Sequence, residues 1–225
     1  MSLWVKICGN TSLGDVQVAV DAGADAVGFV FAPSPRQVTA EQVAGITPHL
    51  PSSIEKIGVF VEPDIAALTA TIRQSGLTGA QLHFPPGKDG STMTARIRQE
   101  FGSGLRILRV IHFGAEAGAE LQAASGDPNL DGVLIDSRTA TAVGGTGIAF
   151  DWQAARTTLF TPGNRLRLIA AGGLNPANIS EAIATLHPWG VDVSSGVEAA
   201  PGRKDQAKVR AFVRNARTAR LDGRP

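Results

Sequence analysis

The chain has 225 residues, of which 43% are hydrophobic and 18% are charged, and its formal net charge is +1. This composition is typical of a compact globular protein, and so small a net charge gives no electrostatic basis for binding nucleic acid or a membrane surface. The single cysteine, Cys8, excludes an internal disulfide and fits a reducing cytoplasm. Because neither a signal peptide nor a bilayer-length apolar run is evident, we expect one cytoplasmic domain.

Short apolar runs alternate with helical patterns along the chain. Strands are predicted at Leu3–Cys8, Ala26–Phe31, Ile54–Val61, Gly79–His83, Leu105–His112, Gly132–Asp136, Leu166–Ala170 and Val191–Ser194. Helices are predicted at Ser12–Ala22, Ala40–Thr47, Asp64–Gln74, Thr92–Phe101, Ala115–Ala124, Asp151–Leu159, Asn178–Leu186 and Lys204–Thr218. Suitable helix starts are Ser12, Thr39 and Asn175-Pro176. Eight such units predict a single (β/α)8 TIM barrel, a parallel eight-stranded barrel with outer helices, over residues 1–219, and a short polar tail over 220–225.

The end of the first strand carries a candidate reactive thiol. Barrels of this class build their active sites at the C-terminal ends of the strands, which is where Cys8 lies. Side-chain alternation puts Lys6 on the same face, where its cation would lower the thiol pKa from about 8.5. The alternative is an inert, buried cysteine, and we favour the reactive one.

Other strand ends carry further polar candidates. Arg36 follows two prolines that fix its place on the rim, and its guanidinium suits a carboxylate; the alternative is a solvated loop arginine. His83 suits either acid–base chemistry or a structural role. Asp136 ends an apolar strand, where an acidic side chain packs poorly, so we favour a function for it.

Glycine-rich loops on the same rim suit an anionic ligand. Gly172-Gly173 and Ser195-Gly196 follow the last two strands, and such small residues let a phosphate approach the backbone N–H groups. Two ordinary turns are the alternative, but two loops in register favour a phosphate site. The segment 144–147 is also glycine-rich and offers more amides. Asp192 lies inside its strand, where it suits a ligand or the neutralisation of Lys6 or Arg109.

Motifs spread along nearly the whole chain carry a family resemblance. They are Lys6-Ile7-Cys8-Gly9, Ser34-Pro35-Arg36, Ile57-Gly58-Val59-Phe60, Gln81-Leu82-His83, Asp136 with Gly144-Gly145-Thr146-Gly147, Phe150-Asp151-Trp152, Ala171-Gly172-Gly173-Leu174 with Pro176 and Asn178, Val191-Asp192-Val193-Ser194-Ser195-Gly196-Val197-Glu198, Pro201-Gly202 and Lys204-Asp205. In this order the set resembles the phosphoribosylanthranilate isomerases of tryptophan biosynthesis. One departure is Phe84-Pro85-Pro86, because the family commonly has glycine directly after the histidine of that motif.

The resemblance implies a barrel enzyme that isomerises a small phosphosugar carrying an anthranilate group, without metal or organic cofactor. The implied catalytic residues are Cys8 as base and Asp136 as acid. The implied substrate-binding residues are Arg36, His83, Gly145, Gly147, Gly172, Gly173, Asp192, Ser194, Ser195 and Gly196. The protein would act as a monomer or a homodimer.

Two other functions fit parts of the pattern. Another phosphosugar barrel, such as an epimerase or a synthase, would share the phosphate loops. An epimerase usually needs metal ligands or paired carboxylates, and the four histidines form no ligand cluster in the sequence. A non-catalytic phosphate-binding barrel would keep the loops but would not need both Cys8 and Asp136.

Overall fold

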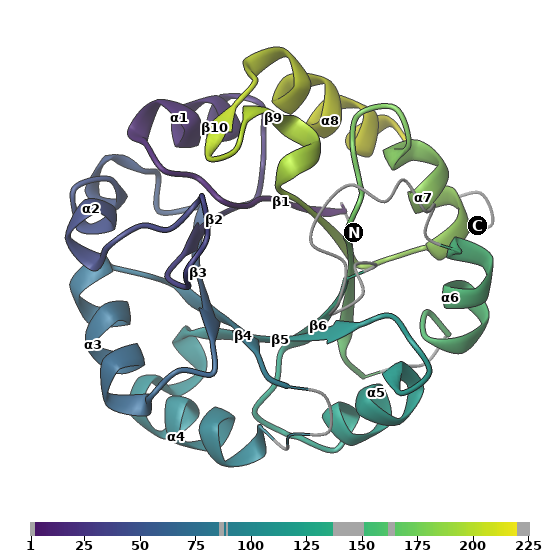
Figure 1. Cartoon of the computed structure of the whole chain (residues 1–225), viewed down its shortest axis with the longest axis horizontal. Coiled ribbons are helices and arrows are strands. Elements are labelled where there is room, and N and C mark those ends of the chain that lie inside the picture. Colours follow the sequence, from purple (N-terminus) through teal and green to yellow (C-terminus); the bar gives the residue numbers. More distant parts are fainter. Residues whose placement is uncertain (1–2, 86–87, 89, 137–150, 162–164, 220–225) are drawn as a thin grey trace.

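The computed structural model describes residues 3–85, 88, 90–136, 151–161 and 165–219. Its centre is a closed barrel of eight parallel strands in the order β1 to β8, as Figure 1 shows end-on. The strands are β1 (Trp4–Ile7), β2 (Ala26–Val30), β3 (Glu55–Val61), β4 (Gly79–His83), β5 (Arg106–His112), β6 (Gly132–Asp136), β7 (Arg167–Ala171) and β8 (Gly190–Val193).

Helices form a ring outside the barrel (Figure 1). They are α1 (Leu13–Asp21), α2 (Ala40–Ala44), α3 (Ile65–Ser75), α4 (Ser91–Phe101), α5 (Ala117–Ser125), α6 (Trp152–Thr158), α7 (Ile179–Leu186) and α8 (Gln206–Thr218). Three short 3-10 helices are η1 (Thr47–His49), η2 (Gly102–Gly104) and η3 (Ser195–Val197). The prediction of a single (β/α)8 barrel is therefore confirmed. The predicted tail 220–225 lies outside the described residues.

Side-chain alternation divides the core into two layers. One set of strand residues packs against the surrounding helices. The other set fills the barrel interior, and its apolar members are Trp4, Ala26, Ile57, Leu108, Val110, Leu134, Ile169 and Ala171. Because both faces of each strand are covered, the strands read in sequence as nearly continuous apolar runs.

Aromatic and charged side chains close the N-terminal end of the barrel. Trp4 stacks on Trp189 with ring centroids 5.3 Å apart, and the guanidinium groups of Arg106 and Arg167 lie over the Trp189 ring at 5.5 Å and 4.8 Å. Glu55 accepts hydrogen bonds from Trp4 Nε1 and from Arg106. A cation over an indole face is favourable, so this end is stabilised by its own side chains.

The predicted caps Ser12 and Thr39 are confirmed, whereas the predicted start at Asn175-Pro176 and the start of the last helix are wrong. Helix α7 begins at Ile179, one residue after the predicted start, but its N-cap is Asn178. The Asn175 side chain instead accepts hydrogen bonds from the Ala177 and Asn178 N–H groups in a turn before the helix. Helix α8 begins at Gln206, with Asp205 as its N-cap.

The chain before α8 forms a two-stranded hairpin that the sequence pattern did not predict. Its strands are β9 (Glu198–Ala200) and β10 (Arg203–Lys204), so Lys204 lies in a strand and not in the last helix. Figure 1 shows the hairpin beside α1 and α8. No helix within the described ranges is long and apolar enough to span a bilayer.

We expect Leu134→Ala to lower the free energy of unfolding by about 2–5 kcal/mol, because it leaves a cavity in the barrel interior. The Leu134 side chain is 1% exposed and belongs to the inner apolar cluster. Leu13→Ala is the matched control, since Leu13 is 39% exposed and its loss should change stability by no more than about 0.5 kcal/mol. Urea unfolding of both variants measures the difference, and equal midpoints would contradict the two-layer core.

Candidate functional site

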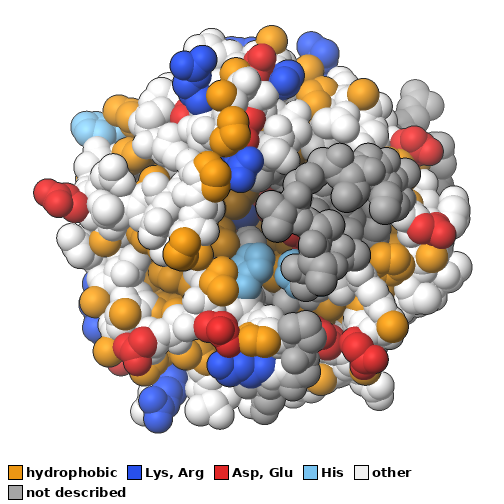
Figure 2. Space-filling view, viewed as in Figure 1, with side chains coloured by type: hydrophobic (Ala, Val, Ile, Leu, Met, Phe, Trp, Pro, Cys, Tyr) orange, Lys and Arg blue, Asp and Glu red, His pale blue; other side chains and the backbone are white. Residues whose placement is uncertain are grey.

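The predicted site residues meet at one end of the barrel. Cys8, Arg36, Gly173 and Gly196 follow the C-terminal ends of their strands, and His83 and Asp136 are the last residues of β4 and β6. Since all eight strands are parallel, these ends share one rim. Figure 2 shows this face hollowed at its centre, with histidine and basic side chains around the hollow.

Cys8 is held tightly at the end of β1. The residue is 6% exposed, and its N–H donates a hydrogen bond to the Val193 carbonyl of β8 at 2.8 Å. Gly28 of β2 makes room for the thiol, because a Cβ at that position would come within 2.6 Å of Cys8 Sγ and 3.0 Å of Lys6 Cε. The thiol and the Lys6 side chain therefore lie side by side over a glycine.

Lys6 is fully buried in the barrel interior below Cys8. Its Nζ donates to Asp192 Oδ1 and to Gln81 Oε1, both at 2.9 Å. Asp192 therefore neutralises Lys6, one of the two roles considered for it. Arg109 is not its partner, because that guanidinium donates to the Lys88 carbonyl and lies over the Phe84 ring.

The expected lowering of the Cys8 thiol pKa is wrong, although Lys6 does act in the expected direction. Burial raises the pKa of the Cys8 thiol above its ordinary value, and the Lys6 ammonium offsets this only in part because Asp192 opposes it. Burial also acts to lower the pKa of Lys6, but the Asp192 carboxylate and Cys8 outweigh it and raise that pKa. The free site therefore favours a neutral thiol beside a charged lysine.

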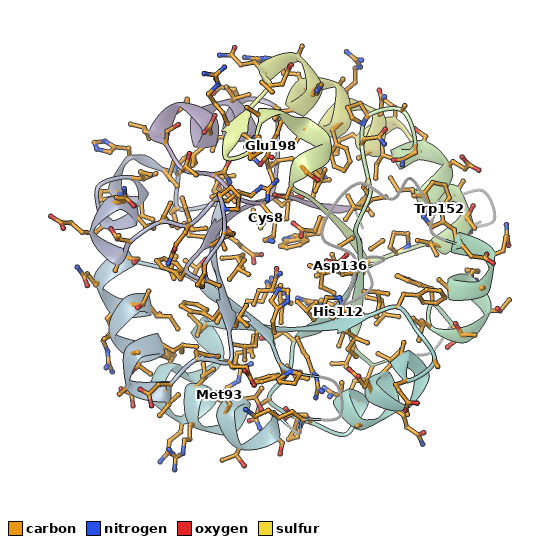
Figure 3. The ribbon with its side chains drawn as sticks, in the orientation of Figure 1. Cys8, Met93, His112, Asp136, Trp152 and Glu198 are labelled. Atoms are coloured by element: carbon orange, nitrogen blue, oxygen red, sulfur yellow. The ribbon has the colours of Figure 1, made fainter. Side chains whose placement is uncertain are left out.

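Asp136 is the last residue of β6, which is separated from β1 in the barrel by β7 and β8. It is 2% exposed and pairs in register with His112, the last residue of β5. The His112 ring lies 6.1 Å from the His83 ring, and His83 Nε2 is 3.4 Å from Gln81 Nε2. His112 was not predicted as a site residue. It could have been, because it is a polar residue at the C-terminal end of an apolar strand, as Asp136 is. Figure 3 shows Asp136 and His112 close together.

The two small-residue loops pack against each other. A Cβ at Gly196 would lie 1.9 Å from the Leu174 carbonyl oxygen, so only glycine permits this contact. Gly172 and Gly173 both have positive φ, of 81° and 64°. The Asn178 side-chain amide donates to the Gly173 carbonyl at 3.0 Å and holds this turn in place. Gly145 and Gly147 lie outside the described residues.

Arg36 is held by a carboxylate that the sequence analysis did not single out as a site residue. Its Nε and Nη2 donate to Glu198 Oε1 and Oε2 at 2.8 Å and 2.7 Å, which is a bidentate pair. Lys204 Nζ donates to the same carboxylate at 3.1 Å. Glu198 and Lys204 were missed because the hairpin that brings them together was not predicted.

The described residues contain no group of three or more histidine, cysteine, aspartate or glutamate side chains suited to a metal ion. The polar groups at this rim are instead a thiol, carboxylates, imidazoles, ammonium groups and a guanidinium. Such a set suits acid–base chemistry on an anionic substrate.

Known proteins match this chain along almost its whole length. The family model of N-(5'-phosphoribosyl)anthranilate (PRA) isomerase matches residues 5–215. The N-(5'-phosphoribosyl)anthranilate isomerase of Pelobacter propionicus is 42% identical over 219 residues, with 97% of each chain covered. The crystal structure of phosphoribosyl anthranilate isomerase from Thermus thermophilus has a TM-score of 0.80 at 30% identity, covering 97% of this chain and 100% of the other. Another isomerase structure, in complex with reduced 1-(o-carboxyphenylamino)-1-deoxyribulose 5-phosphate, has a TM-score of 0.76 at 31% identity, covering 95% and 98%.

We expect alkylation of Cys8 by iodoacetamide to have a higher pH midpoint in the folded protein than in the same chain unfolded in guanidinium. The thiolate is the reactive form, and burial raises the pKa of this thiol. Because Cys8 is the only cysteine, the mass increase reports on one site. Restricted access slows the folded protein at every pH, so midpoints rather than absolute rates are compared. A folded midpoint at or below the unfolded one would contradict the burial argument.

Proposed function

Because this chain belongs to the N-(5'-phosphoribosyl)anthranilate isomerase family, we propose that it catalyses the Amadori rearrangement of N-(5'-phosphoribosyl)anthranilate by general acid–base chemistry. The product is 1-(2-carboxyphenylamino)-1-deoxyribulose 5-phosphate. This family supplies an isomerisation step of tryptophan biosynthesis. The predicted state, monomer or homodimer, stays a prediction.

The observation that carries the proposal is the placement of Cys8 and Asp136. They come from β1 and β6, on different walls of the barrel, and both border the central opening in Figure 3. Both are buried, at 6% and 2% exposure. A ribose held between them would meet an acid on one side and a base on the other, as the rearrangement requires.

We assign the first proton transfer to Asp136. Protonation of the furanose ring oxygen lets the C1'–O bond break, and the nitrogen lone pair forms the C1'=N bond of an open-chain Schiff base. This step needs a carboxyl group in its protonated form, and Asp136 is the almost fully buried carboxyl group that ends β6.

We assign the second proton transfer to Cys8. The thiolate removes the proton from C2', the C–H electrons form the C1'=C2' bond, and the C=N electrons return to nitrogen to give an enolamine. Tautomerisation of the enolamine then gives the ketone. The ammonium group of Lys6 stabilises the thiolate against the effect of burial.

The two anionic ends of the substrate fit the two basic or amide-rich parts of the rim. Arg36 suits the anthranilate carboxylate, and the loops at Gly173 and Gly196 suit the phosphate. The structure of a family member with the reduced product supports a site that takes both groups. Holding both ends fixes the ribose between Cys8 and Asp136, and such orientation contributes several powers of ten to rate.

Cys8→Ser and Asp136→Asn should each lower kcat by about 10²–10⁴-fold, because a positioned acid or base contributes on that order. A serine hydroxyl is too weak an acid to supply a base at neutral pH, and an asparagine amide cannot deliver the proton. Loss of anthranilate-type fluorescence on mixing with phosphoribosylanthranilate measures turnover. Substrate deuterated at C2' should show a primary isotope effect in the parent protein under single-turnover conditions.

The controls use the same assay. A well-folded parent protein that leaves the fluorescence unchanged would reject the isomerase and leave a non-catalytic phosphate-binding barrel. Parent-like turnover by Cys8→Ser would place the base elsewhere, with His83 and His112 as the next residues to test.

Gly28→Ala should lower kcat/KM by about 10²-fold, since a shift of about 1 Å in a catalytic group has an effect of that order. The new Cβ would meet Cys8 Sγ at 2.6 Å and push the thiol from its position. Gly118→Ala in α5 is the control, because its Cβ would meet no atom within 4 Å. Steady-state kinetics on both variants, together with thermal melting, separate displacement of the thiol from loss of folding. Full activity in a folded Gly28→Ala protein would contradict the placement of Cys8.

A further inference from the structure

The hairpin β9–β10 places two charged side chains behind the rim, and the proposed reaction steps use neither of them. Glu198 pairs with Lys204 in the hairpin register, and the register shifts between Arg203 and Lys204. Both side chains are almost fully buried, with 5% exposure for Glu198 and 0% for Lys204. A buried ion pair is unfavourable unless its geometry is good, so its contacts indicate what it does.

Lys204 binds the backbone just after β1 and just after β8, the two strands whose pairing closes the barrel. Its Nζ donates to the Cys8 carbonyl at 2.5 Å and to the Ser194 carbonyl at 3.3 Å. Cys8 directly follows β1, and Ser194 directly follows β8 and begins the loop that the phosphate is proposed to occupy. One ammonium group therefore links the backbone of the base to the backbone of the phosphate loop.

Glu198 connects this ammonium group to Arg36. Its Oε1 accepts hydrogen bonds from both Lys204 Nζ and Arg36 Nε, and its Oε2 accepts from Arg36 Nη2. A bidentate pair fixes the plane of a guanidinium as well as its position. Figure 3 shows Glu198 beyond Cys8, on the outer side of the opening.

The surrounding backbone leaves this cluster little freedom. A Cβ at Gly9 would lie 2.6 Å from Arg36 Cδ and 2.8 Å from Ser194 Oγ, so three segments meet there. At the hairpin turn, the Gly202 carbonyl accepts a hydrogen bond from Thr11 Oγ1 at 2.6 Å. The hairpin is thus anchored to the loop after β1 as well as to the loop after β8.

We propose that Glu198 and Lys204 are positioning residues that hold three parts of the substrate site at fixed separations: the Arg36 guanidinium, the Cys8 backbone and the Ser194 loop. The inference rests on the proposed function, because it assigns these three parts to one substrate. The two residues act through the groups they hold and do not touch the reacting atoms.

The charge states agree with this role. Burial acts to raise the pKa of the Glu198 carboxyl, but Arg36 and Lys204 outweigh it and lower that pKa, so Glu198 is ionised at neutral pH. Burial lowers the pKa of Lys204, and the Glu198 carboxylate opposes this effect. The Lys204 ammonium also acts to lower the pKa of the Cys8 thiol, which gives the pair a readout beyond folding.

The Glu198 arm of the test separates KM from kcat. Glu198→Gln keeps the side-chain shape but removes the negative charge that accepts both hydrogen bonds from the Arg36 guanidinium. We expect KM for phosphoribosylanthranilate to rise about 10-fold or more while kcat stays within about threefold, because Arg36 binds the substrate without taking part in proton transfer. An unchanged KM in a folded variant would overturn the role of Glu198.

The Lys204 arm uses the single cysteine. Lys204→Met removes the ammonium group behind Cys8, and we expect the pH midpoint of Cys8 alkylation to move upward and kcat/KM to fall by about 10²-fold. Arg203→Met is the matched control, because it removes a cation from the exposed neighbouring position of the same strand. A Lys204→Met protein with the parent midpoint and parent kinetics would overturn the role of Lys204.

A double variant keeps the test decisive where one unpaired charge prevents folding. Glu198→Gln with Lys204→Met removes both members of the pair and should restore folding, as melting would show. A folded double variant with a higher KM and a higher alkylation midpoint than the parent supports the positioning role of the pair. A KM and a midpoint equal to those of the parent would overturn that role. The alkylation measurement needs no turnover. An inactive parent protein would therefore contradict the proposed isomerase activity, while the alkylation midpoints would still test the role of Lys204.

Discussion

The pairing of β1 with β8 is the constraint on which the rest of this structure depends. It closes the barrel with Lys6 opposite Asp192 and Ile7 opposite Val193. A slip of one residue would turn Lys6 outward and move every side chain of β1 to the other face, because strand side chains alternate. The same register places Cys8 beside the end of β8, where the Cys8 N–H donates a hydrogen bond to the Val193 carbonyl. Barrel closure and the arrangement of the site are therefore set by one strand pair.

Buried charge reinforces this closure at two levels. Below the rim, Lys6 is bound by Asp192 and Gln81, and at the rim Lys204 is bound by Glu198 and two backbone carbonyls. Removing one partner of a buried pair typically costs about 3–5 kcal/mol, whereas replacing the whole pair by apolar groups is often neutral. The barrel interior is filled elsewhere by apolar side chains such as Leu134 and Ile169. The need to fill space therefore does not explain why these two positions hold charged clusters. Their directional hydrogen bonds fix the positions of neighbouring groups, which apolar packing specifies less sharply.

The barrel and most of its rim could be predicted from the sequence because they follow from local patterns. Apolar runs marked the strands, and polar residues at their ends, such as Asp136, marked the rim. The hairpin was missed because Lys204 precedes an amphipathic helix and its local sequence resembles the first turn of that helix. Its ammonium group is bound by the Cys8 carbonyl, which is 196 residues away in the sequence. The direction of the Cys8 pKa shift was missed for a related reason. Sequence spacing placed the Lys6 cation near the thiol, but it carried no information on how deeply the thiol is buried.

The depth of the site has opposite consequences for the two groups that we propose as acid and base, Asp136 and Cys8. Burial favours the neutral form of both a carboxyl and a thiol. For the acid proposed at Asp136, the neutral form is the one that the first proton transfer needs. For Cys8 it is the form that cannot act as a base, and the buried ammonium groups of Lys6 and Lys204 offset only part of the effect. A thiolate of raised pKa is scarcer but also a stronger base, and removal of a proton from carbon benefits from that strength. If Cys8 is the base that we propose, the two lysines raise the population of its thiolate, while burial maintains the basicity of that thiolate.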